Sequence, residues 1–221
     1  MFGQNPKLPP EKSDGLSLKV TEIFETIQGE GPLAGQAALF IRLSGCNLAC
    51  SFCDTEFDKY TIHSPDQIVE RASNLESNLR LIVITGGEPM RQNIAPLCDA
   101  MLAHGFDIQV ETNGTIYRPL DKRVMFVCSP KFEGEKEYKI DPRFFDHSFY
   151  YKFLVNARDQ KSHSYYEKFL SKNYVREQLY LQPMDEYDAI KNAANIEHTV
   201  KLVKDGGFRL SLQLHKILGV E

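Results

Sequence analysis

Three cysteines crowded into one short segment constrain this 221-residue chain more than any other feature of its sequence. Cys46, Cys50 and Cys53 follow an apolar run at residues 38–43, so we expect them on one loop at the carboxyl end of a strand. Thiolates are preferred ligands of Zn²⁺ and of iron–sulfur clusters. The Cys-x₃-Cys-x₂-Cys spacing therefore predicts a metal centre. The odd total of five cysteines suits a reducing compartment better than a disulfide framework.

Two plainer interpretations of these cysteines remain open at this point. His63 would complete a four-coordinate Cys₃His zinc site, or the three thiols would be unrelated and buried. The other two cysteines are expected as small buried hydrophobic residues without a role as ligands, because Cys98 lies in a helical pattern and Cys128 ends a predicted strand.

The spacing of apolar residues along the chain predicts an α/β fold. Short β-branched or aromatic runs indicate strands, and apolar residues at roughly helical spacing indicate helices between them. The predicted strands are residues 18–24, 38–43, 81–85, 107–111, 124–128, 150–155, 178–182 and 208–212, and the predicted helices are residues 65–77, 93–104, 162–172 and 187–204. Such an order implies parallel strands joined by right-handed crossovers, with ligand-binding loops at their carboxyl ends.

The ends of the predicted helices carry recognisable signals. Ser64, Pro65 and Gln67 form a capping-box signature, and Gly105 and Gly206 are expected to end helices. Residues 1–15 are polar and rich in proline and lysine, so we expect a flexible leader there, followed by a single domain at residues 16–221.

Composition and charge exclude several classes of function. The formal net charge is −4, from 26 basic and 30 acidic residues, and no block of five like charges occurs. Tight binding to nucleic acid is therefore disfavoured. No apolar run approaches the about 20 residues that span a bilayer, and the amino terminus lacks the apolar core of a secretory signal. We therefore expect a cytoplasmic protein with no membrane partner.

Polar motifs follow several later strands of the predicted sheet. Gly-Gly-Glu-Pro at 86–89 comes directly after one strand, and its two glycines allow a ligand to approach the backbone. Glu-Thr-Asn-Gly at 111–114, Ser-Pro-Lys at 129–131 and Gln-Pro-Met-Asp at 182–185 follow other strands. Each motif is a weak signal alone, but parallel strands would bring all of them to one edge of the sheet.

The cysteine spacing, followed one crossover later by Gly-Gly-Glu-Pro, resembles the radical S-adenosylmethionine (SAM) superfamily. The resemblance implies a partial (β/α)6-type radical SAM barrel with parallel strands, since a full eightfold barrel typically takes about 250 residues. It also implies a [4Fe–4S] cluster on the three cysteines with one open iron that binds SAM, and an electron donor such as flavodoxin. One electron from the cluster would cleave SAM to a 5′-deoxyadenosyl radical.

Further blocks resemble one family within that superfamily, the 7-carboxy-7-deazaguanine synthases of queuosine and 7-deazapurine biosynthesis. These blocks are Phe-Glu-Thr-Ile-Gln-Gly-Glu-Gly-Pro at 24–32, Phe-Ile-Arg-Leu-Ser-Gly-Cys-Asn at 40–47, Cys-Asp-Thr at 53–55, Thr-Gly-Gly-Glu-Pro-Met at 85–90 and Leu-Ser-Leu-Gln-Leu-His-Lys at 210–216, together with the other motifs above. The resemblance runs from about residue 18 to the end of the chain. It implies a homodimer that contracts the ring of 6-carboxy-5,6,7,8-tetrahydropterin, with loss of ammonia, to 7-carboxy-7-deazaguanine.

The same resemblance implies roles for individual residues. Contact with SAM is implied for Phe52, Cys53, Asp54, Gly87, Ser129, Pro130, Lys131, Gln182, Pro183, Met184 and Asp185. Contact with the pterin is implied for Ile27, Gln28, Gly29, Arg42, Thr85, Glu111, His215 and Glu221, the last matched only by counting from His215. Thr55 would hold a Mg²⁺ ion that bridges to the substrate. Simpler roles stay open for Arg42 as a surface ion pair, for His215 as a structural histidine and for Thr55 as a turn residue.

Two rival functions also stay open. A radical SAM activase that installs a glycyl radical on a partner protein would share the cluster and the glycine-rich turn, but has no evident need for Gln28, Arg42 and His215. A non-catalytic iron–sulfur or zinc-binding module would need the cysteines alone.

Overall fold

The structure is a computed structural model that describes residues 5–53, 55–57, 59–133, 136–145, 149–158 and 176–220. The strands are β1 (Leu18–Ile27), β2 (Ala37–Leu43), β3 (Thr61–His63), β4 (Leu81–Gly86), β5 (Asp107–Thr112), β6 (Met125–Cys128), β7 (Phe132–Glu133), β8 (Lys136–Glu137), β9 (Tyr150–Val155), β10 (Leu179–Pro183) and β11 (Arg209–Leu210). The α-helices are α1 (Pro65–Ser73), α2 (Ala95–Ala103), α4 (Ala189–Gly206) and α5 (Leu214–Leu218). The 3₁₀ turns are η1 (Gly31–Leu33), η2 (Pro89–Arg91), η3 (Pro142–Phe145) and η4 (Arg176–Gln178).

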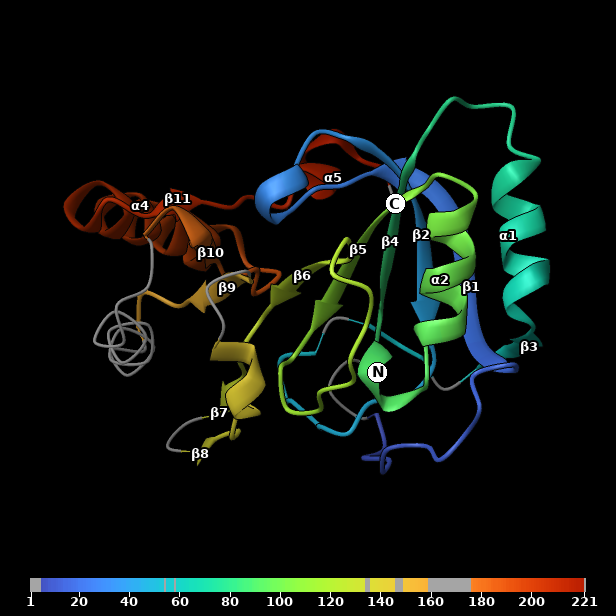
Figure 1. Cartoon of the computed structure of the whole chain (residues 1–221). Helices are drawn as coiled ribbons and strands as arrows, with labels where there is room; N and C mark the ends of the chain where they lie inside the picture. Colours follow the sequence, from blue (N-terminus) through green and yellow to red (C-terminus); the bar gives the residue numbers. More distant parts are fainter. Residues whose placement is uncertain are drawn as a thin grey trace.

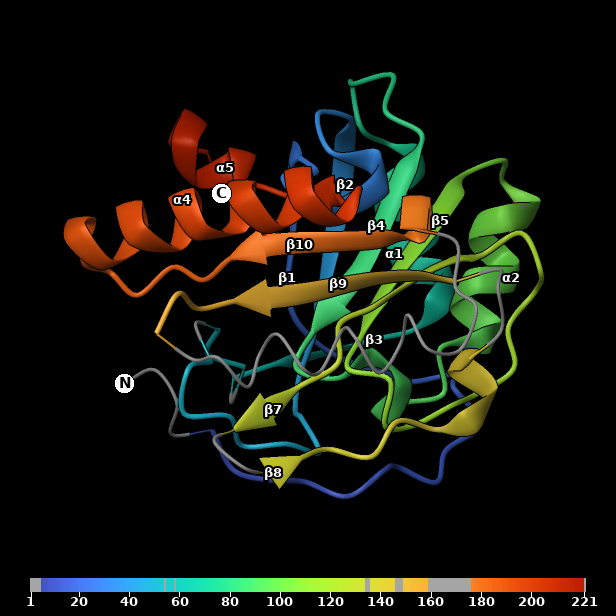
Figure 2. The ribbon, with the colours of Figure 1, turned by 90° about the vertical axis from the view of Figure 1, so that its left-hand side faces the viewer.

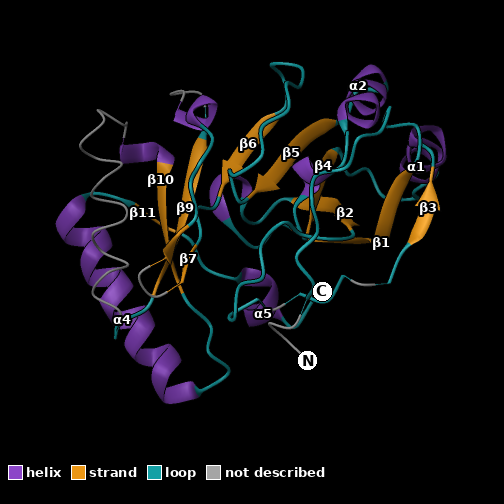
Figure 3. Cartoon of the chain, turned by 90° about the horizontal axis from the view of Figure 1, so that it is seen from below, coloured by secondary structure: helices purple, strands orange, loops and turns teal. Residues whose placement is uncertain are grey.

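Nine of these strands form one sheet in the order β11-β10-β9-β6-β5-β4-β2-β1-β3 (Figure 1). The strands from β11 to β2 in this order pair in parallel, whereas β1 pairs antiparallel with β2 and with β3. Figure 3 shows the sheet as an arc, with α1, α2 and α4 outside it and α5 on its inner side. The predicted α/β fold with parallel strands is confirmed.

Alternate residues of the parallel strands face opposite sides of the sheet, which separates the core from an open inner face. On β9, Tyr151, Phe153 and Val155 join the main hydrophobic core, whereas Lys152 and Leu154 line a cavity on the other side. That core lies beneath α1 and α2, and Figure 2 shows α4 lying along β10. Each fully buried aliphatic or phenylalanine side chain in the core contributes roughly 1.5–3 kcal/mol. Burial of the outer face therefore holds the sheet in place.

The observed elements agree with the predicted ones except at specific places. Each predicted strand is present, although the last one is reduced to Arg209–Leu210, and α1 ends at Ser73 rather than at residue 77. The connection from β5 to β6 contains no helix, and none was predicted there. The sequence did not reveal β3, the β7–β8 hairpin or α5. The predicted helix at 162–172 lies outside the described residues.

The helix-end signals are largely as predicted. Ser64 Oγ accepts from Gln67 N at 3.2 Å and Gln67 Oε1 accepts from Ser64 N at 2.9 Å, which confirms the capping box. Gly105 follows α2 with a φ of +81°. At the end of α4 the expected residue was wrong by one position, because Gly206 is still helical and Gly207 adopts the left-handed conformation.

The amino-terminal segment, for which the composition predicts a flexible leader, makes backbone contacts with the rest of the chain. Residues 1–4 lie outside the described residues, but residues 5–15 run along the carboxyl-terminal edge of the sheet, where the dark blue trace passes in Figure 1. Leu8 N donates to Cys46 O at 2.8 Å, and Glu11 N donates to Arg91 O at 2.8 Å.

Among the described helices, none combines the length and apolar character that crossing a membrane requires.

Replacing Gly86 at the end of β4 is expected to destabilise the fold. Gly86 has a φ of +126°, and a Cβ there would lie 2.1 Å from Leu43 O on the adjacent strand. Gly86→Ala is therefore expected to lower the free energy of unfolding by at least about 2 kcal/mol, measured by urea unfolding. Gly35→Ala is the matched control, because Gly35 has a φ of +92° but a Cβ there would meet nothing within 4 Å. Equal losses in the two variants would show that the close approach to Leu43 is unimportant.

Candidate functional site

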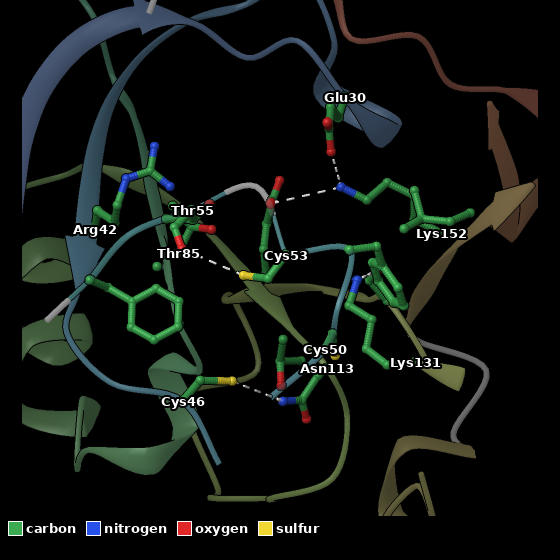
Figure 4. Close-up of a pocket in the computed structure, with 18 of the residues that line it drawn as sticks. Glu30, Arg42, Cys46, Cys50, Cys53, Thr55, Thr85, Asn113, Lys131 and Lys152 are labelled. Atoms are coloured by element: carbon green, nitrogen blue, oxygen red, sulfur yellow. Dashed lines mark hydrogen bonds and ion pairs between the residues drawn. The ribbon is translucent and has the colours of Figure 1, made fainter. Parts of the chain in front are cut away.

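A cavity of about 270 Å³ lies on the inner face of the sheet and reaches the loops at the carboxyl ends of the parallel strands (Figure 4). Most of the residues selected from the sequence line this one cavity. They are Ile27, Gln28, Arg42, Cys46, Cys50, Phe52, Cys53, Thr55, Thr85, Gly87, Glu111, Ser129, Lys131, Gln182, Met184, Asp185 and His215. Segments far apart in the sequence are therefore brought to a single site, as parallel strands require.

A few selected residues do not line the cavity. Pro130 and Pro183 lie next to lining residues without lining it themselves. Gly29 packs behind His215, since a Cβ at Gly29 would lie 2.1 Å from His215 Nδ1. Asp54 and Glu221 lie outside the described residues.

The two remaining cysteines are buried away from the cavity. Cys98 in α2 and Cys128 at the end of β6 are both 0% exposed and belong to the hydrophobic core. Their surroundings match the expectation of small buried hydrophobic residues.

Hydrogen-bond donors lie close to the sulfur atom of the first cysteine of the loop. Cys46 Sγ accepts from Leu48 N at 3.4 Å and from Asn113 Nδ2 at 3.9 Å. Burial, with the Glu88 carboxylate nearby, raises the pKa of the Cys46 thiol to about 12 against the opposing Leu48 N–H. The metal-free loop therefore keeps this proton at neutral pH, and a bound metal would supply the positive charge that stabilises the thiolate.

The three cysteines of the loop are compatible with an iron–sulfur cluster. Among the described residues, no three His, Cys, Asp or Glu side chains converge as the ligands of one metal ion would. An iron–sulfur cluster does not need such convergence, because each thiolate binds a different iron. His63, the candidate fourth zinc ligand, is on β3, where its Nε2 lies 2.7 Å from Thr61 Oγ1, and it does not line the cavity. These positions argue against the Cys₃His zinc site.

The glycine-rich turn after β4 packs directly against the cysteine loop. Gly87 N donates to Leu43 O at 3.1 Å, and Glu88 N donates to Gly45 O at 3.0 Å. A Cβ at Gly87 would lie 2.2 Å from Gly45 O, so no larger residue fits without a shift of backbone. The two motifs form one structural unit, with the backbone of Gly87 exposed to the cavity.

Glu88 in this turn is fully buried among donors. Its carboxylate accepts from Thr112 Oγ1 at 2.7 Å, from Asn113 N at 2.7 Å and from Met90 N at 3.0 Å. Burial raises the pKa of Glu88 to about 7, although these hydrogen bonds and Lys131 act in the opposite direction. A raised folded-state pKa means that Glu88 stabilises the fold below its unfolded pKa and that this contribution disappears as the pH rises through 7.

This titration predicts a pH-dependent stability that one substitution removes. Metal-free protein is expected to lose about 3 kcal/mol of unfolding free energy between pH 5 and pH 8 through Glu88. Glu88→Gln cannot titrate, so its unfolding free energy, from urea titrations at each pH, is expected to change less than that of the wild type. Glu76→Gln, at an exposed position, is the control. A Glu88→Gln profile parallel to the wild-type profile would contradict the raised pKa.

A buried ionic network forms the wall of the cavity opposite the cysteine loop, and the sequence prediction missed its two central residues. Lys152 Nζ pairs with Glu30 and lies 3.9 Å from Glu111 Oε2 (Figure 4). Glu30 Oε1 also accepts from Gln182 Nε2 at 3.0 Å and from Gln213 Nε2 at 2.8 Å. Burial alone would raise the pKa of Glu30, but Lys152 and the Gln213 hydrogen bond lower it to about 2.

Part of this network left a signal in the sequence. Lys152 interrupts the apolar strand Tyr-Tyr-Lys-Phe-Leu-Val, and a charge in such a strand is rare unless paired or functional. Glu30 lies inside the recognised motif at 24–32, but nothing in that motif indicates that its side chain faces the cavity. The same holds for Asn113 in the motif at 111–114, which lines the cavity outside the ionic network. Asn5, which also lines the cavity, had no signal because its segment resembles a leader.

Comparison with known proteins supplies the family. A family model of the radical SAM superfamily matches residues 40–126. The chain is 44% identical over 227 residues to 7-carboxy-7-deazaguanine synthase of Rickettsia prowazekii (strain Madrid E), across 100% of this chain and 96% of that protein. It is 32% identical over 241 residues to the synthase of Rhodospirillum rubrum, across 100% of both chains.

Solved structures agree on the fold. A crystal structure of QueE from Escherichia coli matches with a TM-score of 0.78 at 24% identity, across 92% of this chain and 99% of that one. SuiB of Streptococcus suis, bound to the precursor peptide SuiA, matches with a TM-score of 0.54 at 13% identity, across 76% of this chain and 46% of that one. The predicted partial barrel is confirmed. From the full-length similarity, the chain belongs to the 7-carboxy-7-deazaguanine synthase family of the radical SAM superfamily.

Proposed function

We propose that this protein converts 6-carboxy-5,6,7,8-tetrahydropterin to 7-carboxy-7-deazaguanine with loss of ammonia. One observation carries the proposal: a single cavity is lined by the three cysteines of the loop, by the glycine-rich turn and by polar side chains suited to a carboxylated pterin. A full-length relative at 44% identity is a 7-carboxy-7-deazaguanine synthase, which supports the same reaction. The glycyl-radical activase has no evident need for the polar side chains Gln28, Arg42 and His215 that line this cavity.

The cysteine loop is the part of the site that fits a [4Fe–4S] cluster and SAM. Cys46, Cys50 and Cys53 would hold three irons, and nitrogen donors such as Asn113 Nδ2 already approach the sulfurs. When bound, the cluster and SAM supply the electron and the deoxyadenosyl radical that start the reaction. The backbone of Gly87 lines the cavity beside the loop and would bind the amino acid part of SAM.

Side chains from other strand ends would complete the SAM site. Lys131 Nζ donates to Ser129 Oγ at 2.7 Å after β6, and Gln182 and Met184 line the cavity at the end of β10. A lysine and hydroxyl pair suits the polar parts of SAM, whereas a methionine suits its apolar parts. The full proposed set is Phe52, Cys53, Asp54, Gly87, Ser129, Pro130, Lys131, Gln182, Pro183, Met184 and Asp185.

The pterin would lie against the inner strands. Arg42 and Thr85 are register partners on β2 and β4, so both reach the same wall. Arg42 Nε pairs with Glu22 and its guanidinium lies 5.6 Å from the Phe24 ring, contacts that orient a planar group suited to a carboxylate. The surface ion pair considered for Arg42 is thus present, in a residue that also lines the cavity.

Amide and carboxylate groups nearby suit the edge of a pterin ring. Gln28 Nε2 donates to Glu111 Oε1 at 3.0 Å, and both side chains line the cavity with His215. These groups offer donors and acceptors in the plane that a pterin edge presents. Thr55 would hold Mg²⁺, which commonly takes few protein ligands and completes its octahedron with water and substrate oxygens.

Arg42→Lys is expected to weaken pterin binding without loss of the fold. A lysine keeps the charge but loses the paired planar donors, so the KM for the carboxytetrahydropterin is expected to rise about 10- to 100-fold. Steady-state kinetics under anaerobic conditions measure this change. Arg123→Lys is the control, because the Arg123 side chain is 60% exposed and pairs with Asp121. An unchanged KM in Arg42→Lys would remove this residue from the pterin site.

A binding assay tests the proposed substrate directly. Reconstituted protein is titrated anaerobically with carboxytetrahydropterin in the presence of SAM, and saturable binding is expected. A protein that cleaves SAM but does not bind the pterin would favour the activase. A protein that holds zinc and no iron or sulfide would favour the non-catalytic module.

A further inference from the structure

The amino-terminal residues 5–11 are held against the cysteine loop by backbone contacts. Lys7 and Cys46 form a parallel β-bridge, and Leu8 N donates to Cys46 O at 2.8 Å. This segment precedes the superfamily match at residues 40–126 and contributes no strand to the sheet. It therefore lies outside the strands and helices of the barrel and is attached to the first cysteine of the loop.

Asn5 extends this contact to the third cysteine. Its Nδ2 donates to Thr55 O at 2.7 Å and lies 3.8 Å from Cys53 Sγ, and the residue lines the cavity. One amide group thus bridges the end of the cysteine loop and the sulfur that would bind iron. Hydrogen bonds to cluster sulfurs and exclusion of solvent are two of the ways in which a protein adjusts an iron–sulfur cluster.

A buried arginine anchors the other end of the segment. Arg91 has a side chain only 4% exposed, and it donates to Pro9 O at 3.0 Å and to Glu11 Oε1 at 2.6 Å. The same guanidinium donates to Ser44 O at 3.3 Å, and a Cβ at Gly45 would lie 2.7 Å from it. Arg91 therefore joins the amino-terminal segment to the residues just before Cys46 and to the turn after β4.

We infer that residues 5–11 form a strap that fixes the cysteine loop and shields its cluster, with Asn5 as a positioning residue at Cys53. The inference rests on the proposed function, since it requires a cluster on Cys46, Cys50 and Cys53. Asn5 supplies an N–H to the sulfur, and the Leu8–Cys46 bond keeps the segment in place over the loop. This role requires no contact between the strap and SAM or the pterin.

The first test compares Asn5→Ala with Asn78→Ala, a change at an exposed asparagine before β4. Both proteins are reconstituted anaerobically with iron and sulfide, and the cluster potential is measured by redox titration followed by electron paramagnetic resonance. Asn5→Ala is expected to shift the midpoint potential to a more negative value, because a donor to sulfur is lost. In air, the cluster of Asn5→Ala is also expected to lose its absorbance roughly tenfold faster. A factor of about ten is the effect expected when one hydrogen bond to a charged group is lost. Values equal to those of Asn78→Ala would overturn the role of Asn5.

The second test needs no cluster. Leu8→Pro removes the N–H that donates to Cys46 O, whereas Leu8→Ala keeps it. In metal-free full-length protein, Cys46 and Cys53 are expected to react faster with iodoacetamide in Leu8→Pro than in Leu8→Ala, as read by mass spectrometry of the labelled peptides. Equal rates in the two variants would show that residues 5–11 do not fix the cysteine loop. Failure of the wild type to assemble any cluster would instead count against the proposed function, so the two failures are distinguishable.

Discussion

Cys53→Ser is expected to abolish cluster assembly and SAM cleavage together. A serine hydroxyl is similar in size to the thiol, so the loop should keep its backbone contacts, including Cys53 N to Cys50 O at 3.1 Å. The variant lacks one soft thiolate ligand, so only two of the three cysteine ligands of the cluster remain. Because the cofactor carries the difficult chemistry, production of 5′-deoxyadenosine should fall by more than about a thousandfold. Iron and sulfide analysis with the visible spectrum, after anaerobic reconstitution, measures the first loss, and chromatography measures the second.

Cys98→Ala supplies the matched control for that result. Cys98 is as deeply buried as any residue of the core and does not line the cavity. Its replacement is expected to lower the unfolding free energy by about 1–2 kcal/mol while the iron content stays at the wild-type value. A Cys53→Ser protein that still held a cluster and cleaved SAM would remove this loop from the cofactor site. Loss of iron in Cys98→Ala as well would show that cysteine replacement acts through the fold.

Lys152→Met is expected to cause the largest loss of stability among the residues that line the cavity. The side chain of Lys152 is only 7% exposed and its ammonium faces the carboxylates of Glu30 and Glu111. Removing the cation leaves two largely buried carboxylates without their positive partner, and breaking a buried pair in this way costs about 3–5 kcal/mol. Urea unfolding of the metal-free protein at pH 7 measures the loss. Lys201→Met, on the exposed face of α4, should differ little from the wild type.

The pH dependence of the same variant follows from Glu30. Lys152 lowers the pKa of Glu30 to about 2, so this pair stabilises the wild type above the unfolded carboxyl pKa and the contribution is lost as the pH falls toward 2. The deficit of Lys152→Met should therefore shrink in acid. Glu30→Gln combined with Lys152→Met should recover part of the stability at pH 7, because one buried charge is gone. A deficit independent of pH, with no recovery in the double variant, would contradict the proposed pairing.

Strands were the most predictable part of the fold because the parallel strands leave continuous or alternating apolar runs. Residues 81–85 and 150–155, for example, appear as β4 and β9 with nearly the expected bounds. The elements that were missed are short, and their local sequences contribute little to their stability. β3 exists through pairing with β1, and α5 lies on the inner face with no buried residue of its own. Contacts between distant segments decide such elements, and no local pattern reports them.

The site was predictable to the extent that its residues fall in motifs. The three cysteines, Gly87 and Arg42 lie on one cavity because parallel strands deliver their carboxyl ends to one edge. Glu30 follows β1 and Lys152 lies in β9, and these strands are not adjacent in the sheet, so the pairing depends on the curvature that closes the barrel partway. The position of Asn5 in the cavity depends on a tertiary contact, and the composition of its segment predicts no regular structure. These residues required the three-dimensional arrangement.

Anaerobic turnover tests the central claim most directly. Reconstituted wild-type protein is mixed with SAM, a reductant and synthetic 6-carboxy-5,6,7,8-tetrahydropterin, and the products are separated by chromatography with mass detection. If this cavity is a 7-carboxy-7-deazaguanine synthase site, the deazapurine appears only when both SAM and the pterin are present, together with 5′-deoxyadenosine and ammonia. SAM cleavage at an undiminished rate in the pterin's presence, with no deazapurine formed, would contradict it.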